Sequence, residues 1–380
     1  MFASNIGTWM QNITLIALAY SLTGDAWFTG LITFAQLGPM LFLSPFGGAL
    51  ADRLNRRHLL ITLAGTQMIL SFVLALVALD PTPNRAVLVL IVLGIGCAMA
   101  FQGPTANALL PSLVERHDLQ PAIALNSVSM NSSRVVGPLL GGLVGALGGA
   151  SSVFAVNGLT YLFVIWAIMT VDVDFSPKGR SGDGPIEQLR VGFRAVRADQ
   201  VMTRVLVTIS VLSLCSLIFI YQMPVLAEDE LGLTGWSFNL LFAAFALGAA
   251  GGALSMGSLL AGRDRALTAR VALVVFAVAL TVFGVVNLVP VAFAAAIVLG
   301  AAYFIIVTAL STTLQLRVAD EVRGRVMGLW MMAWAGLVPL GGLIAGPIID
   351  LTGISIVLVF GAVVAMILAA TVDLRDRATV

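Results

Sequence analysis

A short charged stretch between two apolar runs holds residues that could act as an electrostatic gate. Gly48 and Asp52 stand four positions apart, and residues four apart share one face of a helix. The glycine would let a neighbouring helix approach closely, so that the Asp52 carboxylate could meet the positive N-terminus of that helix. The plain alternative is a hydrophilic turn between two spans. The predicted gating residues in this stretch are Gly48, Asp52, Arg53, Arg56 and Arg57, and the resemblance described below adds Arg325 at the start of the partner helix.

One cation lies deep inside an apolar run. Arg134 is about 14 residues, or about 20 Å, beyond the start of the run near residue 120. A charge near the centre of a bilayer is costly and usually functional. We predict a role for Arg134 in the transport cycle or in anion recognition. The structural alternative is an arginine that binds carbonyls or polar side chains between helices.

Small residues recur every four positions along the same run, from Ser129 to Gly149. Such a stripe favours close helix packing in a membrane. A second small face, Ala244, Gly248 and Gly252, would match it. The residues predicted to form a packing motif are Gly137, Pro138, Gly141 and Gly142.

Polar and aromatic residues interrupt several otherwise apolar runs and predict a binding cavity. An aromatic, amide-rich pocket without a carboxylate suits a bulky amphipathic solute, neutral or anionic. For any one of these residues, a hydrogen bond between helices is an equal alternative. The predicted substrate-binding residues are Trp9, Gln11, Asn12, Gln36, Gln102, Asn107, Asn126, Trp330 and Trp334.

The composition is that of a membrane protein. Of the 380 residues, 59% are hydrophobic and 10% are charged, and the mean hydropathy is +1.02. Soluble domains carry about 25% charged residues, so lipid must be the solvent here. A net charge of +1 indicates no nucleic-acid partner. Two histidines and two isolated cysteines predict no metal site, and no cofactor is expected.

Apolar runs of about 20 residues, the length that crosses a bilayer, can be placed twelve times. We therefore predict an all-α membrane protein with twelve transmembrane helices. The predicted spans are 2–21, 28–51, 57–79, 86–110, 120–147, 151–171, 203–226, 237–261, 267–288, 290–315, 325–349 and 352–372.

The basic residues predict the orientation. With the N-terminus inside, 18 of the 20 Lys and Arg residues fall in cytoplasmic loops or the C-terminal tail. Arg85 is the one outside, and Arg134 lies within a span. Cytoplasmic loops carry such an excess in membrane proteins, so both termini are predicted to be cytoplasmic.

The longest polar segment, 172–202, divides the spans six and six. Residues 1–171 are predicted to form one six-helix bundle and residues 203–380 a second. Within the linker, Ile186, Leu189, Phe193 and Val196 share one helical face, which predicts a short amphipathic helix on the cytoplasmic membrane surface. The Gly-Gly pairs at 141–142 and 341–342 echo each other, as expected of two related halves.

The charged stretch that contains Asp52 resembles the loop signature of the major facilitator superfamily, Gly-x-x-x-Asp-(Arg/Lys)-x-Gly-(Arg/Lys)-(Arg/Lys). Asn55 stands where the signature has its second glycine, and Asn tolerates the left-handed conformation expected there. The segment 137–142 resembles a motif in span five of drug antiporters of this superfamily. Residues 7–11 and 323–327 resemble the enterobactin-exporter and macrolide-efflux branch.

The resemblance implies a secondary active transporter, not an enzyme. It implies export of a small drug-like or siderophore-like molecule across the inner membrane by alternating access, with the substrate site between the two halves. A monomer in the lipid bilayer is expected. Two alternatives stay open: an uptake symporter or uniporter on the same fold, and a non-transporting membrane scaffold or receptor.

The energy source is predicted by exclusion. No nucleotide-binding loop of the Gly-x-x-x-x-Gly-Lys-(Ser/Thr) type occurs, so uphill transport would be driven by a gradient. Proton antiport is the interpretation that the resemblance favours. However, no Asp or Glu lies deep in a predicted span, where proton relays normally place one, and the coupling ion therefore stays open.

The orientation can be tested by cysteine labelling. A cysteine introduced at Ser181 should react with a membrane-impermeant reagent only after cells are opened, because residues 172–202 are predicted to be cytoplasmic. Labelling of Ser181→Cys from outside intact cells would contradict the orientation.

Overall fold

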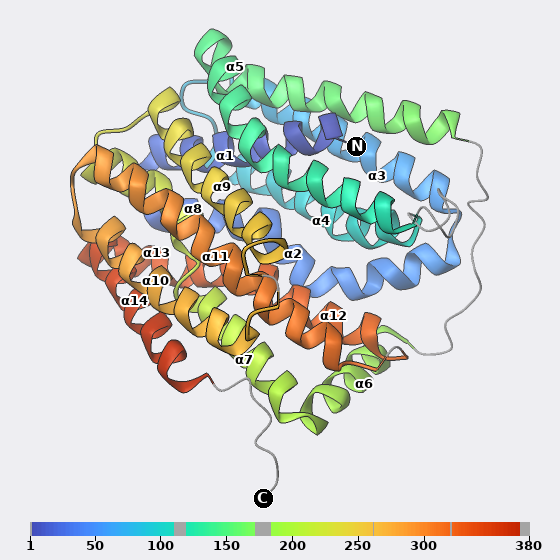
Figure 1. The fold of residues 1–380 in the computed structure, drawn as a ribbon. Coiled ribbons are helices and arrows are strands. Elements are labelled where there is room, and N and C mark those ends of the chain that lie inside the picture. The colour runs from blue at the N-terminus through green and yellow to red at the C-terminus, as the bar shows by residue number, and fades with distance from the viewer. Residues whose placement is uncertain (1, 110–118, 172–183, 261, 320, 373–380) are drawn as a thin grey trace, which may run out of the picture. The chain divides into compact units, whose positions relative to one another are not determined.

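The computed structural model describes residues 2–109, 119–171, 184–260, 262–319 and 321–372, and Figure 1 traces them as helices. Short π-helical turns at Leu226–Glu230 and Met332–Gly336 join neighbouring helices. The α-helices are α1 (Phe2–Thr23), α2 (Ala26–Arg53), α3 (Arg56–Val77), α4 (Arg85–Leu109), α5 (Leu119–Thr170), α6 (Pro185–Ala198), α7 (Gln200–Cys215), α8 (Phe219–Val225), α9 (Gly235–Gly257), α10 (Arg265–Val285), α11 (Val289–Arg317), α12 (Arg323–Met331), α13 (Leu337–Thr352) and α14 (Ile354–Thr371).

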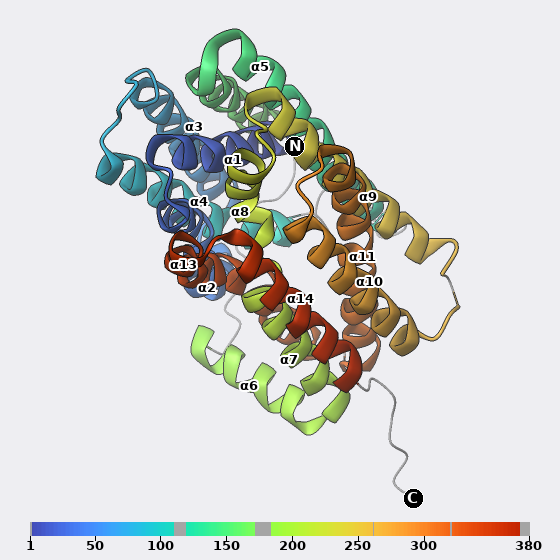
Figure 2. The same cartoon turned by 90° about the vertical axis from the view of Figure 1, so that its left-hand side faces the viewer.

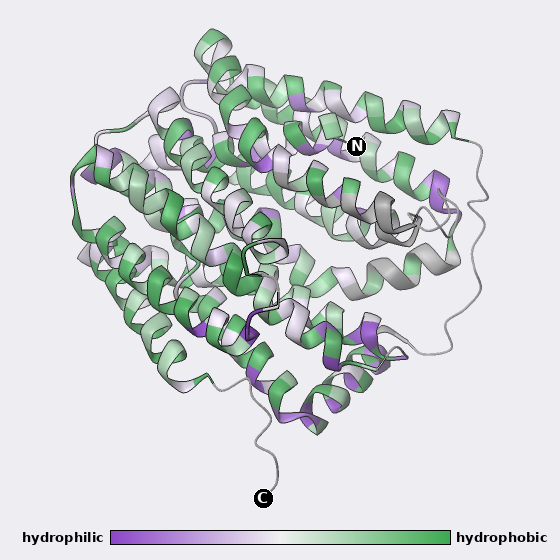
Figure 3. Cartoon of the chain, viewed as in Figure 1, coloured by the Kyte–Doolittle hydropathy of each residue, from purple (hydrophilic) through white to green (hydrophobic). Residues whose placement is uncertain are grey.

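Most helices are apolar along their length, as the hydropathy colours in Figure 3 show. Ten segments of the described chain are long and apolar enough to cross a membrane. One of them, Val128–Thr170 in α5, has 43 residues and is long enough to cross twice. With α1, which has 22 residues, the described ranges hold twelve spans, as predicted.

The two spans of α5 meet at a break in the helix. Gly148 and Gly149 leave the helical conformation, and Gly149 has a φ of 69°, which glycine adopts without strain. The Ser152 hydroxyl donates to the carbonyls of Val144 (3.0 Å) and Gly149 (2.7 Å). Two backbone carbonyl oxygens at the break therefore have a hydrogen-bond partner. The break falls where the sequence predicted a short loop, between residues 147 and 151.

The described chain divides into two compact units. Unit 1 consists of Met1–Gly24, Leu31–Pro185 and Gly235–Leu240, and unit 2 of Asp25–Gly30, Ile186–Thr234 and Leu241–Val380. Each unit contains a short segment from the other half of the sequence, namely one end of α9 in unit 1 and the first turn of α2 in unit 2.

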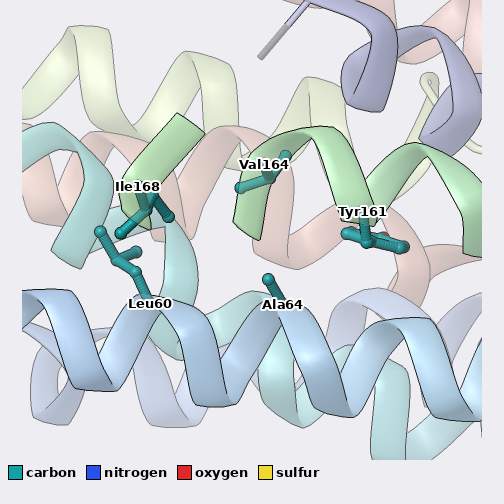
Figure 4. Packing of buried hydrophobic residues seen from close by; sticks show 5 residues of the cluster. All are labelled: Leu60, Ala64, Tyr161, Val164 and Ile168. Atoms are coloured by element: carbon teal, nitrogen blue, oxygen red, sulfur yellow. The ribbon is translucent and has the colours of Figure 1, made fainter. Parts of the chain in front are cut away.

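In unit 1, α5 packs against both α1 and α3. Leu60 and Ala64 of α3 face Tyr161, Val164 and Ile168 in the second half of α5, as Figure 4 shows. Within each helix these positions are spaced three or four residues apart, which puts them on one face. This cluster fixes which faces of α3 and α5 meet.

In unit 2, aromatic rings fill the centre. The ring of Phe219 lies 5.5 Å from that of Phe245 and 6.2 Å from that of Phe283, both in edge-to-face arrangements. Helix α10 lies beside α11 and α14, and its position beside α14 can be followed in Figures 1 and 2.

The small face of α9 corrects one expectation. Side chains added at Gly248 and Gly252 would meet the backbone of Ile297 and Ala301, so these glycines face α11 in their own unit. The sequence predicted that they would match the small stripe of α5. The spacing of small residues predicts close approach but not the partner, because any helix backbone can fill the groove.

The amphipathic helix predicted in the linker is α6. Val196 is buried, while Ile186 and Phe193 are 65% and 54% exposed. A Cβ at Gly192 would lie 3.1 Å from the carbonyl oxygen of Arg325, so α6 packs with one side on α12. The four apolar residues therefore do not form one buried face: one side of α6 meets α12, and Ile186 and Phe193 point away from the protein.

Asp199 ties the end of α6 to the end of α11. Its carboxylate caps α7 by accepting from the amides of Val201 (2.8 Å) and Met202 (3.0 Å). The Nε atom of Arg317 donates to it at 2.9 Å. Partial burial raises the pKa of Asp199, but these hydrogen bonds and the arginine charge outweigh it and hold the pKa below its ordinary value.

The Asp199–Arg317 pair predicts a pH-dependent stability. The lowered pKa means that the pair stabilises the fold fully above the ordinary Asp range near pH 4, and that this contribution is lost as the pH falls through the folded value. Asp199→Asn keeps the cap but loses the charge, and should cost about 0.5 kcal/mol at pH 7 because the pair is partly exposed. Asp199→Ala also loses the cap and should cost about 1 kcal/mol more. Thermal unfolding in detergent at pH 7 and pH 3 measures both. An Asp199→Asn deficit that persists at pH 3 would contradict the assignment.

Candidate functional site

The predicted gate begins at the turn between α2 and α3. Asn55 caps α3 by accepting from the amides of Arg57 (3.0 Å) and His58 (3.3 Å). Its backbone is extended, with φ −63° and ψ 114°. The expectation of a left-handed turn residue is therefore wrong, because Asn here serves as a helix cap.

The last arginine of the signature binds the end of α5. Arg57 donates from Nε to the carbonyl of Ile168 (3.0 Å) and from Nη2 to those of Met169 (2.9 Å) and Val171 (2.8 Å). These carbonyls lie at the C-terminal end of the helix, where no intrahelical donor reaches them. Arg57 thus links the start of α3 to the C-terminal end of α5 within unit 1.

The other gating residues are placed as follows. Arg56 is buried at 4% exposure, and Arg325 is half-buried in the first turn of α12. The surroundings of Gly48 and the side chains of Asp52 and Arg53 lie outside the described part of the structure, although the backbone of all three belongs to α2. The electrostatic gate at Asp52 stays a prediction.

Arg134 lies over an aromatic ring. Its guanidinium carbon is 5.3 Å from the centroid of Trp9 in α1, within the range of a cation–π contact. Gly137, one turn further along α5, makes room for this arrangement: a Cβ there would lie against the Cβ of Trp9, at 2.5 Å. Within unit 1, a membrane-embedded cation is therefore held against an indole. Arg134 supplies the cation, Trp9 the indole, and Gly137 the space between the two helices.

The remaining motif residues of α5 are packing contacts. A Cβ at Gly141 would lie 3.3 Å from the Cα of Met10 in α1. A Cβ at Gly142 would lie 2.5 Å from the ring of Trp236 in α9. Pro138, in the preceding turn, is buried within a continuous stretch of α5. The two glycines thus let α1 and the start of α9 come close to α5.

The amides of unit 1 form a buried network rather than an open lining. The Oε1 atom of Gln11 accepts from Ser71 (3.0 Å) and from Asn157 (2.9 Å), and all three side chains are buried. Gln36 donates to Asn12 at 2.6 Å, and both are buried. For these three predicted substrate contacts, Gln11, Asn12 and Gln36, the geometry favours the alternative of a hydrogen bond between helices.

A second cluster contains Gln102. Its Oε1 atom accepts from Gln67, and Gln67 in turn accepts from the hydroxyl of Tyr161 at 3.1 Å. Ser71 and Tyr161 were missed as partners in the sequence. The available signal was their spacing, because each stands four residues after a polar residue on the same helix face, Gln67 and Asn157 respectively.

The remaining predicted binding residues are spread over both units. In unit 2, Trp330 is buried, and the indole of Trp334 donates to the hydroxyl of Tyr303 at 2.8 Å. In unit 1, Asn126 is half-buried, and the side chain of Asn107 lies outside the described residues. The structure describes each unit by itself, so a common cavity of these residues stays a prediction.

One hollow of about 570 Å³ lies at the start of α10 and the end of α11. None of the predicted substrate-binding residues lines it. Its lining residues are Gly262, Arg263, Asp264, Arg265, Ala266, Thr313, Leu316 and Arg317.

The whole-chain comparison decides the family. Residues 1–379 match the family described as Transmembrane secretion effector, MFS_3. The chain belongs to this family. The resemblance to the major facilitator superfamily is confirmed, and the protein is a multi-pass membrane transporter.

Curated relatives of this family member are exporters. The enterobactin exporter EntS of Shigella boydii serotype 4 (strain Sb227) is 28% identical over 324 residues, which are 83% of this chain and 72% of that protein. EntS of Citrobacter koseri is 28% identical over 320 residues, with the same coverage of both chains.

Solved transporters share the fold. The nucleoside transporter NupG superposes with a TM-score of 0.76 at 14% identity, covering 97% of this chain and 95% of that chain. A bacterial homologue of the human lysosomal transporter Spinster, in an inward-facing and unoccupied conformation, gives 0.71 at 17% identity, covering 97% and 93%. At such identities the likeness concerns the fold alone.

The Arg134–Trp9 contact predicts a set of transport phenotypes. Arg134→Ala should abolish transport without loss of expression, because a mid-membrane cation is kept at a cost only where it acts. Arg134→Lys should restore transport poorly, because an ammonium does not stack on an indole as a planar guanidinium does. Gly137→Ala should also impair transport by displacing Trp9.

Gly145→Ala is the matched control on the same stripe of α5. A Cβ there would lie 3.6 Å from Val153, an ordinary contact, so transport should be unchanged. Efflux from whole cells, normalised to the amount of protein in the membrane, measures all four variants. Near-normal efflux by Arg134→Ala would show that Arg134 is a packing contact and has no role in transport.

Proposed function

We propose that this transporter exports a small amphipathic organic molecule, neutral or anionic, from the cytoplasm across the inner membrane by alternating access. The observation that carries the proposal is the Arg134–Trp9 contact in unit 1, where a cation and an indole lie together 5.3 Å apart inside an apolar span. A paired cation and aromatic ring suit a solute that has both an electron-rich or anionic group and a planar apolar body.

The proposed direction of transport and the proposed substrate class are inferred from the relatives. Those named above are enterobactin exporters, so a siderophore-like or drug-like solute is the class that we propose for this chain. The tryptophans of unit 2 support an aromatic solute. Trp334 is fixed by its bond to Tyr303, and a fixed indole can bind a ring without further loss of side-chain freedom.

The energy source that we propose is the proton gradient. Among the described residues no Asp or Glu lies in the middle of a span; the carboxylates of Asp350 and Glu230 lie at helix ends. Coupling would then use an acid at a helix end. The predicted gate at Asp52 would close the cytoplasmic side.

Transport into inverted membrane vesicles tests the proposal. Vesicles that contain the protein should accumulate a fluorescent amphipathic anion when a proton gradient is imposed, and accumulation should stop when the gradient is collapsed. Vesicles with Arg134→Ala serve as the inactive control. Uptake only by right-side-out vesicles would indicate a symporter, and no transport in either orientation with a folded protein would favour a scaffold or receptor.

A further inference from the structure

Two helices of this protein, α2 and α9, have several residues in each unit. The first turn of α2, up to Gly30, belongs to unit 2, and the helix continues in unit 1 from Leu31. The start of α9, Gly235–Leu240, belongs to unit 1, and the rest of α9 to unit 2. A transporter that works by moving two units must therefore dock and release these two turns.

Both turns dock on a glycine of the helix that receives them. In unit 1, Gly142 of α5 receives the ring of Trp236 in α9. In unit 2, a Cβ at Gly346 of α13 would lie 2.5 Å from the Cα of Trp27 in α2, and a Cβ at Gly30 would lie 2.6 Å from the carbonyl oxygen of Gly342. In each unit a glycine thus receives a turn that carries a tryptophan. Gly142 of the Gly-Gly pair has this place in α5, whereas in α13 it belongs to Gly346, one turn after the corresponding pair.

The α2 turn has a polar attachment as well. The amide of Ala26 donates to Oδ1 of Asp350 at 2.7 Å, and the amide of Trp27 donates to Oδ2 at 3.0 Å. These amides open the helix and have no intrahelical acceptor, so the carboxylate satisfies them and meets the positive end of the helix. Within the described part of the chain, Asp350 forms no salt bridge.

Gln222 of α8 holds the same turn from the other side. Its Nε2 atom donates to the carbonyl of Ala26 at 3.1 Å and to the carbonyl of Gly342 at 3.3 Å. The side chain is completely buried. One amide group therefore bridges the start of α2 to the docking surface of α13, and Ala26 is bound through both its donor and its acceptor.

The helix that receives the α9 turn lacks the corresponding carboxylate. Position 150 in α5, eight residues after Gly142, holds Ala where α13 holds Asp350 eight residues after Gly342. Thr234, which precedes α9, makes no capping bond with its side chain. The Nδ2 atom of Asn239 donates back to Gly235 of its own helix at 2.8 Å. Both docking sites place a glycine against the incoming turn, but the carboxylate of Asp350 has no counterpart at position 150.

We propose that Asp350 and Gln222 form a latch that holds the first turn of α2 in unit 2, and that release of this latch is required for the outer side of the transporter to open. The name "outer" rests on the proposed exporter topology, which places the α1–α2 connection outside. The carboxylate of Asp350 is exposed to solvent, so water can replace the α2 amides during opening. The buried Gln222 then limits the motion, because its amide must exchange protein partners for water.

Spin-label distances across the outer side test the latch without any substrate, so the result is independent of the proposed export. Labels at Ser21→Cys in unit 1 and Leu288→Cys in unit 2, both exposed, would be measured in lipid nanodiscs after replacement of Cys97 and Cys215. Asp350→Ala should raise the population of long distances roughly two- to thirtyfold, the range for a carboxylate at a helix N-terminus. Gly346→Ala should act in the same direction by steric contact with Trp27.

The chain offers a matched control. Gly342→Ala adds a Cβ with nothing within 4 Å and should not change the distances. Should Asp350→Ala fail to fold, Asp350→Asn keeps the shape but turns one oxygen into a donor that faces an α2 amide, and should also favour long distances. Wild-type distances in folded Asp350→Asn, or equal effects of Gly342→Ala and Gly346→Ala, would overturn the latch. If the latch variants open the outer side while wild-type vesicles transport nothing, the latch stands and the exporter proposal fails.

Discussion

Lipid offers no hydrogen bonds, and this constraint shapes how the polar groups in the spans are arranged. Each backbone donor and acceptor must be satisfied within the protein, and a polar side chain must find a partner on a neighbouring helix. The bonds of Gln11 to Ser71 and Asn157 meet this requirement between three helices. Arg57 meets it at the end of α5, and Ser152 at the break within α5. The polar contacts therefore determine, together with apolar clusters such as that between α3 and α5, which helix faces fit together.

Close backbone approach is the second consequence of the same solvent. Apolar side chains gain little by leaving lipid for protein, so association depends on packing and on hydrogen bonds. Glycines supply that packing where one helix meets the backbone of another, as at Gly248 against Ile297 and Gly300 against Phe245. Gly137 shows the functional use of this device, because the missing side chain is what lets Trp9 lie beneath Arg134.

The spans could be predicted from the sequence because the hydropathy of a segment depends on its own residues and not on the helices that it contacts. Twelve apolar runs and the break near residue 149 follow from it. Partners could not be predicted this way, since they depend on how helices distant in the sequence turn toward each other. For Gln11 the sequence left a cavity contact and a hydrogen bond between helices as equal alternatives, and only its partners show which bond it makes. Asn55 was assigned to a left-handed turn although it caps α3. The predicted gate at Asp52 and the cavity between the halves stay untested predictions.

Helix α2 connects the proposed latch and the predicted gate, because it carries one of them at each end. Its first turn holds the latch contacts with Asp350, and its last turns carry the predicted gate at Asp52. With 28 residues the helix is about 42 Å long, so a rigid rod would turn a displacement at one end into an opposite displacement at the other. Pro39 and Pro45 each remove one backbone hydrogen bond between the ends and permit bending there. The stiffness of α2 around these prolines therefore decides whether the two ends open in alternation or independently of each other.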